Sequence, residues 1–387
     1  MGQGSEVYLI RSAGPVRIEL LELRLLRLPL VRAFETSFGR VDARTIVLVT
    51  VHGEGAVGWG ESVADADPHY SGETADSVWQ AIDTYLAPRI LAAPIAHPRD
   101  VGGRLRGIRG HHMAKAAVEM AIWDLHARQL GVPLQQVLGG SRTAVPSGVS
   151  IGIEASIEAL LDRIAIEREA GYQRVKIKIK PGWDTAVVAR IRARWPALPL
   201  MVDANAAYRL TDAATLSGLD AFDLLMIEQP LAEDDLVDHA TLQRTLRTPI
   251  CLDESIDTRA DAAAAIALGA CRVVNIKPGR LGGYAESIAV HDLCAAAGLP
   301  VWHGGMLESG IGRAHNLHLA SLPHFTMPGD IAASERYFQP DVIEPPIRVE
   351  PDGTVAVPRG PGIGVTIVPD RIDRATERRL AKSARAA

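Results

Sequence analysis

The sequence predicts an α/β protein in which a (β/α)8 barrel of the TIM type follows an α+β N-terminal capping domain. The first observation is a repeat of charged residues, each of which ends a short apolar run rich in β-branched side chains. The five residues are Lys178, Asp203, Glu228, Asp253 and Lys277. They are separated by 25, 25, 25 and 24 residues. A period of about 25 residues matches one parallel strand, one covering helix and two short loops.

The second observation is the length of the chain. At 387 residues it exceeds a single barrel of about 250 residues and leaves room for a second domain. We expect the capping domain over residues 1–140, the barrel over 141–345, and a C-terminal segment, 346–387, that returns to the cap. Hydrophobic residues make up 47% of the chain, which supplies ample material for a buried core.

The elements of the capping domain are predicted from local patterns. Residues 18–62 read as three strands, and helical periodicity follows over 75–93 and 113–130. The segment from Gly53 to Gly58 matches a dinucleotide-binding fingerprint by letter, but strand-like sequence follows it where a helix would be required. We therefore favour a hairpin turn at this point.

The C-terminal segment is predicted in two parts. Residues 353–357 are strand-like, and we expect them to return to the cap. Residues 371–387 are rich in Arg and Ala. We predict a solvated helix there and favour it over a binding arm.

Composition excludes several classes of protein. The chain has 41 basic and 46 acidic side chains, a net charge of −5, and no basic stripe with interleaved aromatics, so we expect no nucleic-acid partner. The three cysteines lack metal-ligand spacing and are predicted to be reduced packing residues. No apolar run is long enough to span a bilayer, and the first residues lack the apolar core of a signal peptide. We expect a cytoplasmic protein without a membrane partner.

The charged repeat also predicts a functional site. The C-terminal ends of parallel barrel strands face one rim, where such barrels place their chemistry. Asp203, Glu228 and Asp253 would repel one another there without a cation. Three oxygen ligands suit Mg²⁺ better than zinc, for which His and Cys ligands are typical. Lys178 and Lys277 are then expected to flank the substrate beside the metal.

Histidines give weaker signals. His111 and His112 precede a helix without a third ligand at helical spacing, so capping or a surface position is favoured over metal binding. His303 ends the apparent seventh strand and is expected to face the same rim, either as a general acid or base or as a neutral wall residue. The wall residue is favoured because Lys277, and not a carboxylate, ends the preceding strand.

Five motifs lie at the ends of the proposed barrel strands. They are Lys176-Ile-Lys178, Val202-Asp-Ala-Asn205, Ile227-Glu-Gln-Pro230, Leu252-Asp-Glu-Ser255 and Asn275-Ile-Lys-Pro-Gly-Arg280. Together they resemble the enolase superfamily, in its muconate-lactonising subgroup. More narrowly, residues 180–184, 304–313 and 322–330 resemble the o-succinylbenzoate synthase and N-succinylamino acid racemase family. The likeness extends from residues 34–39 in the cap to the tail.

The resemblance implies a role for each charged residue. Asp203, Glu228 and Asp253 would bind Mg²⁺, or another divalent ion such as Mn²⁺. Lys178 and Lys277 would be the catalytic residues, on opposite faces of the substrate's α-carbon. The residues expected to bind substrate are Lys176, near its carboxylate, and Asn205, Phe34, Tyr70, Ser150, His303 and Met306. Two positions depart from the family pattern, because His303 stands where relatives usually carry cysteine and Asp65 where some carry methionine.

The implied activity is Mg²⁺-dependent removal of a carboxylate's α-proton through an enediolate intermediate. The enediolate either expels a β-hydroxyl group, in the dehydration of 2-succinyl-6-hydroxy-2,4-cyclohexadiene-1-carboxylate to o-succinylbenzoate, or is reprotonated, in the racemisation of an N-succinyl or other N-acyl amino acid. The alternatives are a dipeptide epimerase or a cycloisomerase of the same subgroup, and a catalytically silent scaffold, which the retention of all five charged residues disfavours. We expect a small-molecule carboxylate as substrate, and a homo-oligomer.

Overall fold

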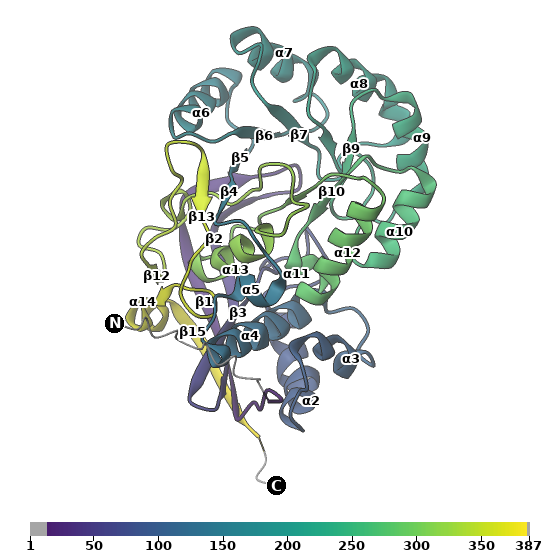
Figure 1. Cartoon of the computed structure of the whole chain (residues 1–387). Helices are drawn as coiled ribbons and strands as arrows, with labels where there is room; N and C mark the ends of the chain where they lie inside the picture. The colour runs from purple at the N-terminus through teal and green to yellow at the C-terminus, as the bar shows by residue number, and fades with distance from the viewer. Residues whose placement is uncertain (1–13, 385–387) are drawn as a thin grey trace, which may run out of the picture.

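The capping domain is built on an antiparallel sheet. The computed structural model describes residues 14–384, so the expectations for the first residues of the chain and for its last three lie outside it. Strands β1 (Leu20–Glu35), β2 (Arg40–Gly53) and β3 (Ala56–Ser62) pair in sequence order. The three strands predicted over residues 18–62 are confirmed, and Figure 1 shows their sheet beside the barrel.

Strand β2 is apolar on both of its faces. Val47, Val49 and Val51 pack in one cluster with the helices of the cap. Ile46 and Leu48, which point the other way, pack in the same cluster as barrel residues. The sheet therefore lies between the cap helices and the barrel, and this explains why the sequence of β2 does not alternate between apolar and polar residues.

Helices cover the outer face of this sheet, and both helical stretches predicted for the cap are confirmed. The elements are α1 (Ala75–Ala81), a π-helical turn (Ile82–Leu86), α2 (Ala87–Leu91), α3 (Val101–Leu105), α4 (His112–Leu130) and α5 (Leu134–Leu138). His111 takes the N-cap position of α4, although its side chain makes no capping hydrogen bond. None of the helices within residues 14–384 is long and apolar enough to cross a membrane.

A two-residue turn joins β2 to β3. The φ angles of Glu54 and Gly55 are 51° and 75°, which is the left-handed region that a type I′ hairpin requires at both positions. Gly53 pairs with Ala56 across the turn. The next element is a strand and not a helix, so the prediction of a hairpin is confirmed.

The tail of the chain differs from its prediction. β13 (Thr354–Ala356) pairs with β4 (Ala144–Pro146) and not with the cap sheet. α14 (Pro369–Ala375) is short, and β15 (Thr376–Ser383) follows it as the fourth strand of the cap sheet, antiparallel to β1. The solvated helix predicted over 371–387 is therefore wrong for residues 376–383. Composition misled the prediction because β15 is an edge strand whose outward charges resemble those of a helix in water.

The barrel begins with seven parallel strands that pair in sequence order. They are β5 (Gly148–Ile151), β6 (Arg174–Lys178), β7 (Leu200–Asp203), β8 (Ile227–Glu228), β9 (Ile250–Leu252), β10 (Val273–Ile276) and β11 (Val301–His303). The barrel helices are α6 (Ile157–Glu169), α7 (Thr185–Arg194), α8 (Ala213–Gly218), α9 (Val237–Thr245), α10 (Arg259–Leu268), α11 (Pro278–Leu281), α12 (Tyr284–Ala296) and α13 (Gly310–Ala320). Figure 1 shows α6 to α10 on the outside of the curled sheet, whereas α11 and α13 are buried and contact the cap.

Residues 325–331 occupy the eighth position of the barrel. The backbone N–H of Asp330 donates to His303 O on β11 at 2.8 Å, and that of Gly148 on β5 donates to Gly329 O at 2.7 Å. The segment thus contacts both edges of the seven-stranded sheet. It forms isolated bridges and no regular strand, because Pro328 within it has no N–H to donate.

The barrel interior is filled by the residues of one strand parity. Met201, Met226, Cys251, Val273 and Trp302 form a separate apolar cluster inside the strands. Residues two positions further along three of these strands are the acidic members of the charged repeat, so they also point inward, at the C-terminal rim. All three cysteines are buried and free, which confirms that they are reduced packing residues.

The contact between β3 and α4 generates a stability prediction. A Cβ atom on Gly58 would lie 2.1 Å from Ala121 O and 2.5 Å from Leu125 N, whereas one on Gly103 would meet nothing within 4 Å. Gly58→Ala should therefore lower the free energy of unfolding by about 2–3 kcal/mol through overpacking. Gly103→Ala, in exposed α3, should raise it by about 0.5–1 kcal/mol. Urea unfolding of both variants checks this, and an unchanged midpoint for Gly58→Ala would contradict it.

Candidate active site

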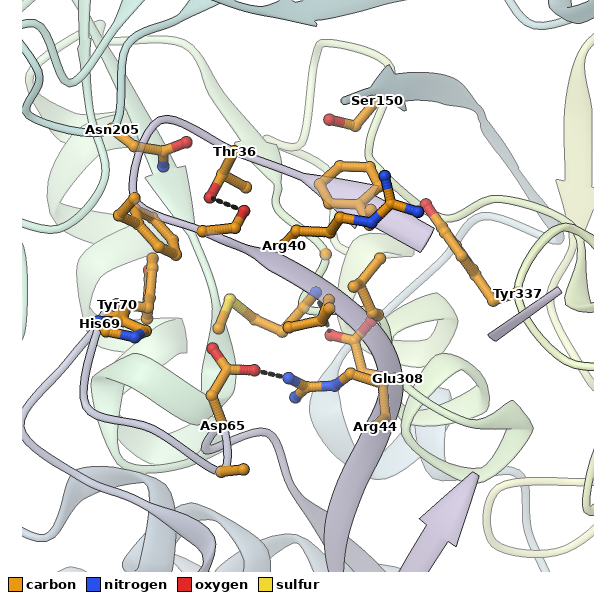
Figure 2. Close-up of a pocket in the computed structure, with 18 of the residues that line it drawn as sticks. Thr36, Arg40, Arg44, Asp65, His69, Tyr70, Ser150, Asn205, Glu308 and Tyr337 are labelled. Carbon is orange, nitrogen blue, oxygen red and sulfur yellow. Dashed lines mark hydrogen bonds and ion pairs between the residues drawn. The ribbon is translucent and has the colours of Figure 1, made fainter. Parts of the chain in front are cut away.

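A cavity lies between the barrel rim and the cap. It is lined by three groups of residues. The barrel contributes Lys176, Lys178 and Lys277, the cap contributes most residues of the segments 34–45 and 65–70, and the loop after β11 contributes residues 305–308. In Figure 2 Ser150 and Asn205 lie at one end of the view, with Arg44, Asp65 and Glu308 at the other.

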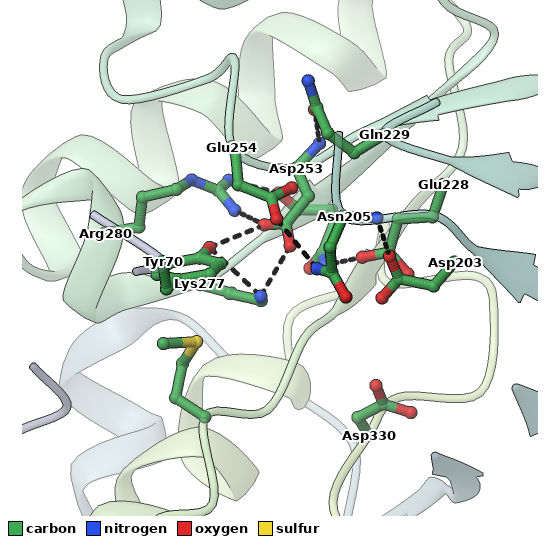
Figure 3. A network of polar contacts seen from close by, with 12 residues as sticks. Tyr70, Asp203, Asn205, Glu228, Gln229, Asp253, Glu254, Lys277, Arg280 and Asp330 are labelled. Atoms are coloured by element: carbon green, nitrogen blue, oxygen red, sulfur yellow. Dashed lines mark hydrogen bonds and ion pairs between the residues drawn. The ribbon is translucent and has the colours of Figure 1, made fainter. Parts of the chain in front are cut away.

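The predicted acidic and basic residues come together at the rim. Lys178 Nζ lies 2.6 Å from Asp203 Oδ2. Lys277 Nζ lies 2.6 Å from Asp253 Oδ2. The exposed fraction is 1% or less for the three carboxylates of the repeat and 7% or less for the two lysines. The sequence thus placed these five side chains in one buried group, as Figure 3 shows for its acidic members and Lys277.

Two further lysine and arginine contacts complete this group. Lys176 Nζ lies 3.0 Å from Glu228 Oε2 and 3.3 Å from Asp203 Oδ2. Arg280 Nη1 forms an ion pair with Asp253 Oδ1. Every carboxylate of the repeat therefore contacts at least one cationic side chain.

Burial and charge shift the pKa values of these groups in different directions. Burial, and then the neighbouring Asp203, raise the pKa of Glu228 to about 7. Burial also acts to raise the pKa of Asp253, but Lys277 and Arg280 outweigh it and hold that pKa below its usual range. Burial acts to lower the pKa of Lys277, but Asp253 outweighs it and raises the value. The site is thus held together as a network of ion pairs.

The chemistry of the donor set suits a hard divalent cation. Three carboxylates from neighbouring strand ends share one small volume, and each already binds positive charge. In this structure the carboxylate oxygens instead contact ammonium and guanidinium groups. For this reason no group of three or more His, Cys, Asp or Glu side chains within residues 14–384 has the geometry to hold a metal ion as it stands. A metal would therefore have to replace contacts that the lysines and Arg280 make here.

Six of the seven predicted substrate-binding residues line the cavity. They are Lys176, Asn205, Phe34, Tyr70, Ser150 and Met306. The Tyr70 hydroxyl donates to Asp253 Oδ1 at 3.0 Å and accepts from Lys277 Nζ at 3.1 Å. Tyr70 thus connects the cap directly to the charged rim of the barrel.

His303 is the seventh, and its predicted position is wrong. Trp302 points into the barrel, so the next residue on β11 points outward. The His303 ring packs against Phe325 at a centroid distance of 5.9 Å and lies outside the main cavity. Gly304 takes the inward position, where a Cβ atom would lie 2.7 Å from Lys277 Cε. The prediction assumed that the last residue of every strand points into the barrel. The last residues of β7 and β8 do so, but the last residue of β11 points outward.

Several residues of the site were given no role by sequence reasoning. Asp330 accepts from Lys176 Nζ at 2.8 Å and pairs with Arg174 Nη1 at 2.8 Å. It lies in the irregular eighth segment, where no strand pattern marks it. Asn275 donates to Glu228 Oε1 at 2.7 Å, and strand parity could have found it, because it lies two residues before Lys277.

Asp65 departs from the family pattern, and the structure shows its partner. It forms an ion pair with Arg44 on β2, and both residues line the cavity. Arg44 also donates to Val63 O at 2.8 Å. The cap end of the cavity is therefore strongly polar, and the pair connects β2 to the segment after β3.

Two family models match the chain. Residues 22–139 match the model described as the mandelate racemase / muconate lactonizing enzyme N-terminal domain. Residues 159–371 match the model described as enolase C-terminal domain-like. Together they span the cap and the barrel.

Characterised relatives and a solved structure resemble most of the chain. An o-succinylbenzoate synthase of Geobacillus stearothermophilus is 50% identical over 363 residues, which are 94% of this chain and 96% of that protein. An N-succinylamino acid racemase of Thermus thermophilus is 50% identical over 361 residues, 93% of this chain and 98% of that protein. The structure of an enolase superfamily member from Listeria innocua superposes with a TM-score of 0.92 at 38% identity, over 95% of this chain and all of that one.

The burial of His303 generates a prediction about acid stability. Burial lowers its pKa to about 3 from an ordinary 6.5, and the nearby charge of Lys277 acts in the same direction. Together they outweigh the negative charge of Asp330, which acts to raise the pKa. The unfolded chain therefore binds a proton below about pH 6.5 that the folded chain does not, so this histidine makes stability fall as the pH drops from about 6.5 towards 3. His303→Leu should lose this dependence and gain about 2 kcal/mol relative to wild type between about pH 7.5 and pH 5.

Urea unfolding of both proteins at these pH values measures the difference. Between about pH 7.5 and pH 8.5 the difference between them should stay constant, because the imidazole is neutral in both folded and unfolded chains. A difference that did not change on acidification would contradict the buried, neutral state of His303.

Proposed function

Because the chain belongs to the enolase superfamily, in the family of mandelate racemase and muconate lactonizing enzyme, we propose that it is a Mg²⁺-dependent enzyme that removes the α-proton of a carboxylate substrate. The products would be the racemised N-succinyl or other N-acyl amino acid, o-succinylbenzoate from its cyclohexadiene precursor, or both. The observation that carries this proposal is the placement of Lys178 and Lys277 on two sides of the cluster formed by Asp203, Glu228 and Asp253.

Barrel geometry supports the two-sided arrangement. With residues 325–331 as the eighth position, β6 and β10 are the second and sixth of eight positions. Strands four positions apart lie across a barrel from each other. Lys178 and Lys277 end or follow these two strands and line the cavity, so a substrate between them would present one face of its α-carbon to each.

The acidic residues would hold the metal. Asp203, Glu228 and Asp253 would bind Mg²⁺, which would act as a Lewis acid that stabilises negative charge on the substrate carboxylate. Lys176, which contacts Glu228 and Asp330, would add positive charge near that carboxylate. Lys178 would accept the α-proton on one face. Lys277 would return a proton on the other face or remain protonated there.

The same proton abstraction leads to both products. If the β-carbon of the substrate bears a hydroxyl group, this group would leave as water with the proton that Lys178 took from the α-carbon, and Lys277 would remain a stabilising cation. If it bears none, the second lysine reprotonates the α-carbon and the substrate racemises. Relatives named for each reaction are each 50% identical to this chain, whereas a muconate cycloisomerase of Rhodococcus opacus is 30% identical. This supports the two succinyl-substrate reactions over cycloisomerisation.

Two arginines of the cavity support a substrate with a charged arm. Arg40 of the cap and Arg313 of α13 line the cavity, and Arg313 Nη1 is buried without a hydrogen-bond partner within residues 14–384. A terminal carboxylate on an acyl arm would supply an acceptor for such a group. Both proposed substrates carry a succinyl arm that ends in this way.

We predict that Glu228→Gln abolishes metal-dependent turnover. The substitution replaces a charged ligand by a neutral one of the same shape, and turnover should fall by about a thousandfold or more. Mn²⁺ binding, followed by electron paramagnetic resonance, should weaken in parallel. Glu308→Gln is the matched control, because Glu308 is another buried cavity carboxylate outside the triad, and it should retain metal binding. Full activity of the wild type in excess chelator would disprove the metal requirement.

We predict that each lysine controls proton exchange on one face of the α-carbon. In deuterated water with Mg²⁺, wild-type enzyme should exchange the α-proton of both enantiomers of an N-succinyl amino acid. Lys178→Ala and Lys277→Ala should each reduce exchange of one enantiomer by about a thousandfold or more, because a general base is missing. Nuclear magnetic resonance measures the two rates separately. Normal exchange of both enantiomers by either variant would show that the two-base scheme is wrong.

A further inference from the structure

The amide of Asn205 lies between a lysine and a carboxylate. Its Oδ1 accepts a hydrogen bond from Lys178 Nζ at 2.6 Å. Its Nδ2 donates to Glu254 Oε1 at 2.8 Å. Figure 3 shows Asn205 next to Glu254 and the carboxylates of the rim. The side chain is 9% exposed, so few water molecules compete for either end.

Both neighbours require the same orientation of this amide. An ammonium group has only donors. Glu254 Oε1 accepts the hydrogen bond of Asn205 Nδ2 whether its carboxyl group is ionised or protonated, although burial and the neighbouring Asp253 raise the pKa of Glu254 to about 8. A flipped amide would place its NH₂ against Lys178 and its oxygen against Glu254, which would break both hydrogen bonds. The backbone holds the amide between them, because Asn205 adopts a left-handed φ of 42° and its N–H donates to Asp203 Oδ1 at 3.0 Å.

We propose that Glu254 is a positioning residue for Lys178 and acts through Asn205. Asp203, the other acceptor of Lys178, is also a proposed metal ligand. If Asp203 binds the metal, Asn205 Oδ1 is the remaining acceptor that holds Lys178 Nζ at the cavity. Glu254 keeps this oxygen oriented towards the lysine. This inference rests on the proposed function, and it assigns Asn205 to the alignment of the base where the sequence assigned it to substrate binding.

Lys277 has a different set of supports, so the effect should be confined to one face of the substrate. Its Nζ contacts Asp253 and the Tyr70 hydroxyl, and Arg280 pairs with the same aspartate. Neither Asn205 nor Glu254 forms a hydrogen bond or ion pair with Lys277 within residues 14–384. Loss of the Glu254 contact should misalign one lysine and leave the other in place.

The test uses α-proton exchange of both N-succinyl amino acid enantiomers in deuterated water with Mg²⁺. Lys178→Ala and Lys277→Ala first assign each enantiomer to one lysine. Glu254→Gln, whose amide no longer dictates one orientation of Asn205, should then slow exchange at the Lys178 face by about tenfold or more, while the Lys277 face stays within about threefold. Equal losses at both faces, a loss confined to the Lys277 face, or no loss would overturn the inference.

A second variant keeps the test decisive if Glu254→Gln does not fold. Asn205→Ala should produce the same bias towards loss at the Lys178 face. The double variant should be no slower than the slower single one, because both act through one contact; multiplied losses would overturn the inference. Tyr70→Phe is the matched control, since it removes a hydroxyl beside Lys277, and the inference fails if it shows the same bias as Glu254→Gln.

The outcome for the wild type separates this inference from the proposed function. A wild-type enzyme that exchanges neither enantiomer would overturn the proposed function, and the inference with it. A wild type that exchanges both, together with a Glu254→Gln variant that slows both equally, would overturn the inference alone.

Discussion

Mutual neutralisation of buried charge at the barrel rim is the constraint on which the rest of this structure depends. Four buried carboxylates and five cations meet there: Asp203, Glu228, Asp253 and Asp330, with Lys176, Lys178, Lys277, Arg174 and Arg280. An isolated buried ion costs several kcal/mol, so each charge needs its partners in place. The barrel provides this, because residues far apart in the sequence return to the same rim at each strand end. The arrangement that allows the charges to be buried also positions them for proton transfer.

Buried carboxyl groups also hold the cap against the barrel. Glu61, on β3, accepts from the backbone N–H groups of Ser309 at 2.9 Å and Gly312 at 3.0 Å, where α13 begins. Glu119, on α4, accepts from Ala285 N at 3.0 Å, in the first turn of α12. Carboxylates at helix N-termini satisfy free N–H groups and the helix dipole. Because α12 and α13 follow β10 and β11, these contacts fix the cap over the strand that leads to Lys277, and with it the wall that closes the cavity.

The sequence predicted the positions of residues correctly where these positions follow from one repeat along the chain. It failed where the position of a residue depends on a contact with a distant part of the chain. The spacing of about 25 residues placed the acidic repeat at one rim. Composition could not show that residues 376–383 pair with β1, because the same charged pattern suits an exposed helix and an edge strand. His303 was misplaced because strand ends were counted and parity was not, although Trp302 marks the inward face of β11. Asp330 was missed because its segment has no strand pattern, and only the closure of the barrel brings it to Lys176.

The sequence by itself determined the fold class, the two layers of the cap, the order of the barrel strands, and the five side chains at the rim. Each of these follows from local chemistry repeated along the chain, which is visible in the order of residues. The tertiary structure alone decided which groups contact one another: Lys178 with Asn205, Asn205 with Glu254, Arg44 with Asp65, and β15 with β1. These contacts join residues on different elements at distances of a few ångströms. No local pattern encodes them, because they depend on the curvature and closure of the whole barrel and on the way the cap lies against it.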